Sequence, residues 1–177
     1  MKLIHVISIG VLALSSSVYA VDGTINFTGE ITSNTCTIDG SVAGAATKTV
    51  ALGNVPASAL SAAGQTAGNK NFSLTLTDCS AVTSVAARFE SLDLASTDGY
   101  LQLSPPAGAT PNAENVEIAI YDNNGVLQPV NGEIPSTSYV NLEDGDAVLN
   151  YIAAYYATGV ATVGPANSVV SYTLSYQ

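Results

Sequence analysis

The residues that could do chemistry are few and do not form a catalytic set. The only histidine, His5, lies in the first 20 residues, and the two cysteines, Cys36 and Cys79, are far apart in the sequence. A nucleophilic serine or cysteine needs a neighbouring base, and a structural zinc site needs clustered ligands. In an exported chain an isolated cysteine pair is most simply a disulfide. A metal pair or a catalytic thiol is the unsupported alternative, because residues 21–177 contain no histidine.

The acidic residues Glu143, Asp144 and Asp146 form a cluster around Gly145. Paired carboxylates could serve a glycosidase, but these lie between two strand-like runs. The cluster also lacks the twelve-residue ligand spacing and the bidentate glutamate of an EF-hand calcium loop. We therefore expect a solvated acidic turn. The sequence contains no phosphate-binding loop or dinucleotide fingerprint, so we expect no cofactor, no metal and no enzymatic activity.

Tyrosines gather near the C-terminus and could suggest a platform for sugars. Alternation instead places several of them in the core, which is the usual place of an aromatic side chain in a strand. The tyrosines concerned are Tyr151, Tyr155, Tyr156, Tyr172 and Tyr176.

Residues 1–20 have the pattern of a secretory signal peptide. Lys2 supplies the positive charge, Leu3 to Leu14 is mostly apolar, and Val18-Tyr19-Ala20 fits a cleavage site. The apolar run is too short to span a bilayer comfortably, and no later run approaches the necessary length. We expect cleavage after Ala20 and no membrane insertion of the mature chain.

The mature chain, residues 21–177, is acidic. It retains three basic residues, Lys48, Lys70 and Arg88, against 14 acidic ones, which gives a net charge of −11. Nucleic acids and anionic lipids are bound by basic patches, so this balance argues against both as partners. The length suits one domain.

The remaining pattern predicts an all-β domain. Residues favourable to strands are frequent, long-chain helix formers are scarce, and short alternating runs are separated by turn residues, as in a sandwich or barrel. Residues 57–68 could hold a short helical turn or be loop. The expected strands are Ile31–Ile38, Thr47–Leu52, Phe72–Leu76, Val85–Leu92, Leu101–Leu103, Val116–Ile120, Val126–Val130, Tyr139–Leu142, Val148–Tyr156 and Val170–Tyr176.

The start of the mature chain is a further alternating stretch. Ile25, Phe27 and Ile31 share one face with Gly29. A glycine inside a strand weakens it and often marks a close approach of another backbone or bulky group. An ordinary first strand with an incidental glycine is the alternative.

Several motifs together make the mature chain resemble pilins of the chaperone–usher class, and most closely the type 1 fimbrial major subunit. The matching segments are Gly23–Ile31 ahead of Cys36, Thr75–Cys79, Asn115–Ile120 and Ala154–Gly159. Two marks at the C-terminus are the most specific. Tyr176 is the penultimate residue, and Gly164 is the fourteenth residue counted back from the end.

The resemblance implies an incomplete immunoglobulin-like β-sandwich, which lacks its last strand and has one disulfide. A periplasmic chaperone fills the resulting groove first. At an outer-membrane usher, the N-terminal extension of the next subunit then replaces it as a donor strand. Strand addition of this kind combines backbone hydrogen bonds with side chains in alternate pockets.

The resemblance also implies roles for particular residues. Residues 21–33 would be the donor-strand extension and residues 34–177 the pilin domain. The donor residues would be Ile25, Phe27, Gly29 and Ile31, with Gly29 where the groove is shallow. The C-terminal strand beside the groove and the chaperone-recognition residues would be Gly164, Val170, Tyr172, Leu174, Tyr176 and Gln177.

The expected function is therefore that of a structural subunit of a fimbrial shaft on the cell surface, which polymerises with other pilin subunits and supports adhesion. The alternative is a minor or tip-associated subunit that binds a receptor directly. The chain has no room for the additional lectin domain of a two-domain adhesin.

Overall fold

The computed structural model describes residues 26, 36–41, 46–80, 82–104, 108 and 110–177. Contacts divide the chain into two units, Met1–Thr32 and Ser33–Gln177, and the fold below is that of the second unit. The predicted signal peptide lies outside the described residues. So do the four predicted donor residues, Ile25, Phe27, Gly29 and Ile31.

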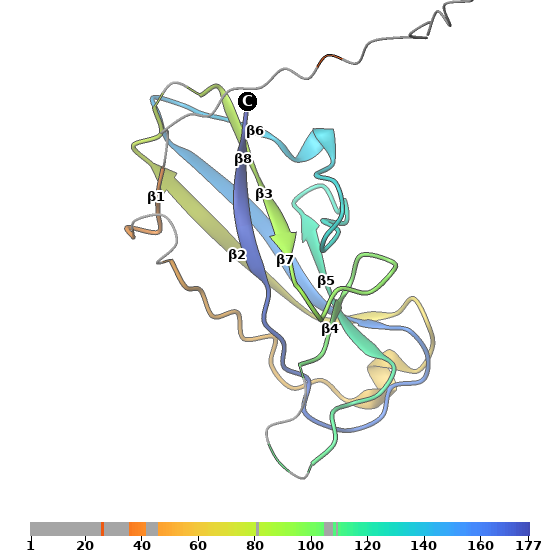
Figure 1. Cartoon of the computed structure of the whole chain (residues 1–177). Coiled ribbons are helices and arrows are strands. Elements are labelled where there is room, and N and C mark those ends of the chain that lie inside the picture. Colours follow the sequence, from red (N-terminus) through yellow and green to blue (C-terminus); the bar gives the residue numbers. More distant parts are fainter. Residues whose placement is uncertain (1–25, 27–35, 42–45, 81, 105–107, 109) are drawn as a thin grey trace, which may run out of the picture. The chain divides into compact units, whose positions relative to one another are not determined.

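The described part of the second unit is all-β, as expected, with two short 3₁₀ helices and no α-helix. Its strands are labelled in Figure 1. They are β1 (Thr37–Ile38), β2 (Thr66–Thr77), β3 (Ser84–Glu90), β4 (Leu101–Gln102), β5 (Val116–Asp122), β6 (Val140–Asn141), β7 (Ala147–Ala157) and β8 (Ser171–Tyr176); the 3₁₀ helices are η1 (Ala57–Leu60) and η2 (Ser136–Ser138).

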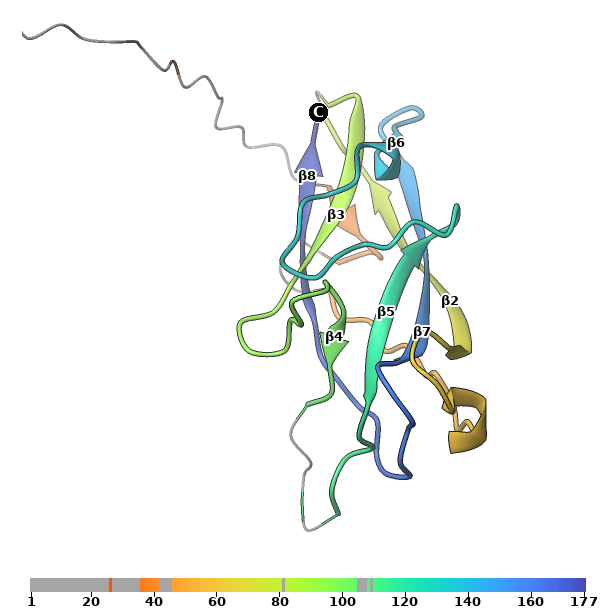
Figure 2. The ribbon, with the colours of Figure 1, turned by 90° about the vertical axis from the view of Figure 1, so that its right-hand side faces the viewer.

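These strands form two antiparallel sheets. One has five strands in the order β1-β2-β7-β5-β4, and the other has three in the order β6-β3-β8. Figure 2 shows β3 and β8 on the left and the long strands β5 and β7 on the right. The C-terminal strand β8 pairs with β3 alone, so it is an edge strand of the smaller sheet.

The core lies between the inner faces of the two sheets. Leu74, Leu149 and Val85 are fully buried, and the ring of Phe89 on β3 meets the ring of Tyr151 on β7 edge to face, with centroids 5.1 Å apart. The Tyr151 hydroxyl accepts a hydrogen bond from the N–H of Ala87 (3.3 Å). Burial of this hydroxyl raises the pKa of Tyr151 to about 12.

Most alternating runs became strands near the expected positions, but two did not. Residues 47–52 are not in a strand in the structure. No backbone hydrogen bond joins them to another described residue, so no described strand pairs with them. Residues 126–130 make only a bridge between Tyr121 and Leu127 and isolated backbone bonds, because Pro129 has no N–H to continue a ladder.

Other boundaries shifted by a few residues. Residues 57–68 hold the η1 turn, yet β2 already begins at Thr66. β3 ends at Glu90, and Leu92 is completely exposed. Of the expected strand over residues 31–38, the structure describes residues 36–38, and Thr37 and Ile38 form β1.

Two sequence expectations about chemistry are answered by the fold. Cys36 and Cys79 form the disulfide, which joins the start of β1 to the end of β2. Glu143 and Asp146 close a turn, with each backbone N–H donating to the other's carbonyl (2.9 Å).

Among the described residues no group of acidic, histidine or cysteine side chains could hold a metal ion, and no helix is long and apolar enough to cross a membrane.

Candidate strand-binding groove

A groove of about 710 Å³ runs along the C-terminal strand, and its lining is mainly apolar. Its floor is formed by inner-face side chains of both sheets, with β8 on one side and residues 46–52 on the other. The lining residues are Ile38, Ala46, Thr47, Lys48, Val50, Leu52, Phe72, Leu74, Phe89, Leu101, Ile118, Ile120, Ala153, Ser168, Val169, Val170, Ser171, Tyr172, Thr173, Leu174 and Tyr176.

The register of β8 shows which of its backbone groups face the groove. Gln177 and Ser84 exchange both backbone hydrogen bonds, with N···O distances of 2.9 and 3.0 Å. Bonded and non-bonded pairs alternate along an antiparallel ladder, so Ser171, Thr173 and Ser175 also bond to β3. The N–H and C=O groups of the intervening residues therefore point to the free edge. These residues are Tyr172, Leu174 and Tyr176.

The same three residues, together with Val170, also line the groove with their side chains. Tyr172, Leu174 and Tyr176 remain partly exposed, although they pack against the core. Among the described residues, this edge thus offers both backbone groups without a partner and an apolar row. Those are the two surfaces that an added β-strand uses. Burial also raises the pKa of the Tyr172 hydroxyl above its usual value.

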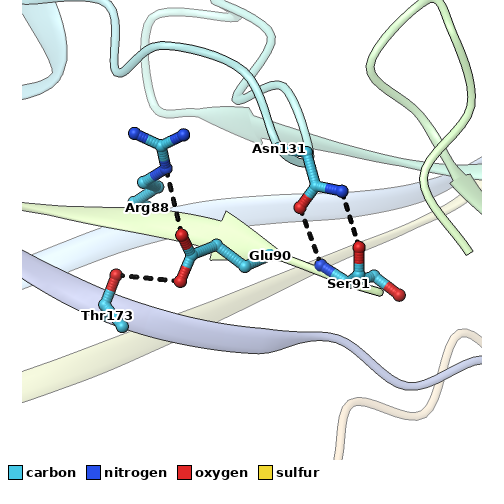
Figure 3. A network of polar contacts seen from close by, with 5 residues as sticks. All are labelled: Arg88, Glu90, Ser91, Asn131 and Thr173. Atoms are coloured by element: carbon cyan, nitrogen blue, oxygen red, sulfur yellow. Dashed lines mark hydrogen bonds and ion pairs between the residues drawn. The ribbon is translucent and has the colours of Figure 1, made fainter. Parts of the chain in front are cut away.

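The side chain of Thr173 lies on the face of β8 opposite to Tyr172 and Leu174, where polar contacts hold the strand, as Figure 3 shows. Thr173 donates a hydrogen bond to Glu90 (3.2 Å), and Glu90 also faces Arg88 (3.2 Å). Nearby, the side chain of Asn131 accepts a hydrogen bond from the N–H of Ser91 (2.9 Å) and donates one to its carbonyl (2.6 Å). These contacts hold β8 and the end of β3 in place while leaving the opposite edge free.

The second side of the groove, residues 46–52, has a different construction. Ala46, Val50 and Leu52 supply apolar side chains, and Lys48 is the only charged residue among the described lining residues. The Lys48 ammonium forms an ion pair with Asp39 (2.9 Å) and donates a hydrogen bond to the carbonyl of Ser73 on β2. Asp39 in turn accepts the N–H of Thr75 (3.1 Å), and its own N–H donates to the carbonyl of Thr75 (2.8 Å).

The structure brings together four of the residues predicted for the C-terminal strand, because Val170, Tyr172, Leu174 and Tyr176 all line the groove. Two others lie elsewhere in the described structure. Gln177 pairs through its backbone with Thr83 and Ser84. Gly164 lies against the loop at residues 111–113, where a Cβ atom would come within 2.4 Å of the Ala113 nitrogen.

The tyrosines separate into three environments. Tyr151 and Tyr155 are buried, as alternation suggested. Tyr172 and Tyr176 line the groove. Tyr156 is only partly buried, and its ring stacks on that of Tyr100 with centroids 4.0 Å apart.

Sequence reasoning missed the role of residues 46–52 and the polar contacts of Lys48. The alternation of Ala46, Lys48, Val50 and Leu52 was a usable signal, but it predicted a paired strand there. The sequence also gave no indication that Phe72, Leu74 and Phe89 form a groove floor. The inner row of a strand has the same alternating pattern whether it faces a packed core or an open groove.

Comparison with known proteins gives a consistent result. The family model described as "Fimbrial protein" matches residues 25–177. The major fimbrial subunit SMF-1 of Stenotrophomonas maltophilia is 37% identical over 166 residues, which cover 89% of this chain and 94% of that protein. The type-1 fimbrial protein A chain of Escherichia coli K12 is 31% identical over 166 residues, covering 93% and 89%.

Solved structures agree on the fold. A type I fimbria protein of Burkholderia pseudomallei superposes with a TM-score of 0.56 at 30% identity, covering 87% of this chain and 97% of that one. The rod subunit PapA of the P pilus superposes with a TM-score of 0.58 at 20% identity, covering 80% and 99%. The second likeness shows the fold alone.

Proposed function

Because the chain belongs to the fimbrial protein family and is a structural subunit of a surface fimbria, we propose that its groove takes up the N-terminal extension of another copy. The observation that carries this proposal is the geometry of β8. Tyr172, Leu174 and Tyr176 direct their backbone groups to a free edge and their side chains into an apolar groove. The family is one of structural pilins, not of enzymes.

The extension has the chemistry that this groove requires. Its alternating row, Ile25, Phe27, Gly29 and Ile31, would enter the groove, while its backbone would add a ladder to β8. Full burial of a large apolar side chain stabilises a complex by about 1.5–3 kcal/mol. Three such side chains and a new ladder would give a contact strong enough to hold a non-covalent fibre together.

The same groove explains why the subunit would need help before assembly. An open edge beside an apolar groove is a template for non-specific pairing and aggregation. We propose that a periplasmic chaperone occupies the groove first, and that exchange for the extension takes place at an outer-membrane usher. The C-terminal carboxylate of Gln177, just past the end of β8, would be the chaperone's anchor.

The direct test is deletion of residues 21–31 in cells that carry the remaining assembly proteins. We expect the shortened chain to be exported and recovered with its chaperone, but to form no fibres visible by electron microscopy. A matched control replaces the same residues with the same composition in scrambled order, which keeps the length and removes the alternation. Fibres of normal appearance from the deleted chain would refute the proposal.

The position within the fimbria is tested by electron micrographs of cells that lack this chain. We propose a place in the shaft, supported by relatives that are named major fimbrial subunits. Loss of the entire shaft in cells without this chain is the expected result. Shafts of normal length that lack only a tip, or that change in length, would place the chain as a minor or tip-associated subunit.

A further inference from the structure

The wall of the groove formed by residues 46–52 is tied to the sheet mainly at its two ends. On its C-terminal side, Tyr155 donates a hydrogen bond to the carbonyl of Gly53 (3.4 Å), and Leu52 packs against the core. On the other side, Cys36 is held by the disulfide and Ile38 pairs with Leu76. Between these ends, none of residues 46–52 forms a backbone hydrogen bond with another described residue.

Lys48 supplies the polar connection in the middle of this wall. β1 pairs with Leu76 and Thr77 of β2. The Lys48 ammonium reaches the same edge of β2 just beyond these two residues. There, Asp39 takes up the N–H and C=O groups of Thr75, and Lys48 takes up the C=O of Ser73. The Lys48 side chain therefore donates to the edge of β2 a hydrogen bond that a longer β1 would otherwise donate.

The ion pair is accessible to solvent. The side chains of Lys48 and Asp39 are 31% and 27% exposed, so added salt can screen their attraction. Burial by itself would raise the pKa of Asp39, but the hydrogen bonds from Lys48 and from the Thr75 N–H outweigh it and hold the pKa below its ordinary value. Asp39 is thus ionised at the pH of the cell surface.

We propose that Lys48, through Asp39 and Ser73, is a positioning residue that holds the 46–52 wall at the distance from β8 that an inserted strand requires. This inference rests on the proposed function and concerns the specificity of the same groove for a second copy of this chain. An apolar residue at position 48 could line the groove but could not reach the Ser73 carbonyl with a hydrogen-bond donor.

The test compares fibres of the full chain with fibres of Lys48→Met, which retains a long side chain and loses the charge. In the fibre the inserted strand would cover the 46–52 wall and protect its amides. We expect their hydrogen exchange to become roughly three- to tenfold faster in the variant, as for loss of a solvent-accessible ion pair and a hydrogen bond. We expect subunits to leave the variant fibre in moderate urea faster by a similar factor. Lys48→Arg, which keeps the charge and a donor, should restore most of both.

The matched control is Lys70→Met, which removes the same charge from an exposed position on β2 that does not line the groove. It should leave exchange in residues 46–52 and the rate of subunit loss unchanged. Salt provides a measurement that a purely structural role would not move. Raising the salt concentration should speed exchange in residues 46–52 of the wild-type chain and have little effect in Lys48→Met.

Two results would overturn the proposal: Lys48→Met fibres that match the Lys70→Met control, or wild-type exchange in residues 46–52 that does not respond to salt. The salt measurement needs no variant, so it decides the question even if Lys48→Met fails to assemble. Failure of the proposed function has a different outcome, namely fibres that form without residues 21–31. A normal Lys48→Met fibre together with a non-assembling deletion would contradict only the role of Lys48.

Discussion

Tyr151 shows at the level of one residue how the two sheets are joined. Its ring lies between Phe72 (5.4 Å between centroids) and Phe89 (5.1 Å), and its hydroxyl accepts the Ala87 N–H from the opposite sheet. The N–H of Ala87 is free for this contact because it faces away from β8, in the alternation that directs Leu174 toward the groove. One register therefore determines both a core contact and the functional edge.

The raised pKa of Tyr151 predicts a pH dependence of stability. The folded state keeps the Tyr151 proton up to a pH of about 12, whereas the unfolded chain releases it near the ordinary tyrosine pKa of 10.0. The unfolded state is therefore favoured increasingly as the pH rises from 10 toward 12, and the contribution is fully present below pH 10. We expect the wild type to lose about 2 kcal/mol more than Tyr151→Phe by pH 12.

Urea unfolding at pH 8, 10, 11 and 12, for the wild type and for Tyr151→Phe, measures this difference. Tyr139→Phe is the control, because its hydroxyl contacts Ser175 near the surface (2.9 Å). Parallel loss of stability in the wild type and in Tyr151→Phe over this range would contradict the assignment.

At the level of elements, the disulfide closes the end of the sandwich where the 46–52 wall originates. Cys36 and Cys79 are 43 residues apart and join β1 to β2. Closing a loop of this length removes about 4 kcal/mol of chain entropy from the unfolded state. We expect the double substitution to alanine to lower the free energy of unfolding by about that amount, as measured by urea titration of the exported chain. A loss well under half of this value would show that the bond matters little for stability.

The elements also show how far the sequence could lead. Phe72 to Leu76 and Val116 to Ile120 alternate, and both became strands of the larger sheet, because each has a buried row of side chains and a pairing strand on both edges. Residues 47–52 alternate as well, but periodicity reports only which side chains share a face. Whether another strand lies alongside depends on the rest of the fold, and here the neighbouring position is the groove.

The sequence predicted only part of the candidate site. The row Val170 to Tyr176 could be found from its alternation and from the resemblance to pilins. The contribution of Lys48 could not, because a lysine in a polar stretch gives no sign that its ammonium will reach a carbonyl of another strand 25 residues away. Long-range polar contacts of this kind leave no local pattern.

For the whole molecule, the central claim is that the fold is completed by a segment from a second copy. The described unit has a sheet edge at β8 and a groove of about 710 Å³ beside it. Amide hydrogen exchange resolved by residue tests the claim most directly, because the proposal gives the backbone of β8 two alternating partners. Ser171, Thr173 and Ser175 bond to β3 within the subunit, whereas Tyr172, Leu174 and Tyr176 would bond only to the inserted strand.

The measurement compares the amides of β8 in assembled fibres with those in the unassembled chain that lacks residues 21–31, after its chaperone has been removed. We predict that the amides of Ser171, Thr173 and Ser175 are protected in both. Those of Tyr172, Leu174 and Tyr176 should be protected in the fibre and exchange at least tenfold faster in the truncated chain, as for backbone groups without a hydrogen-bond partner. Equal, fast exchange of these three amides in the fibre would contradict the account.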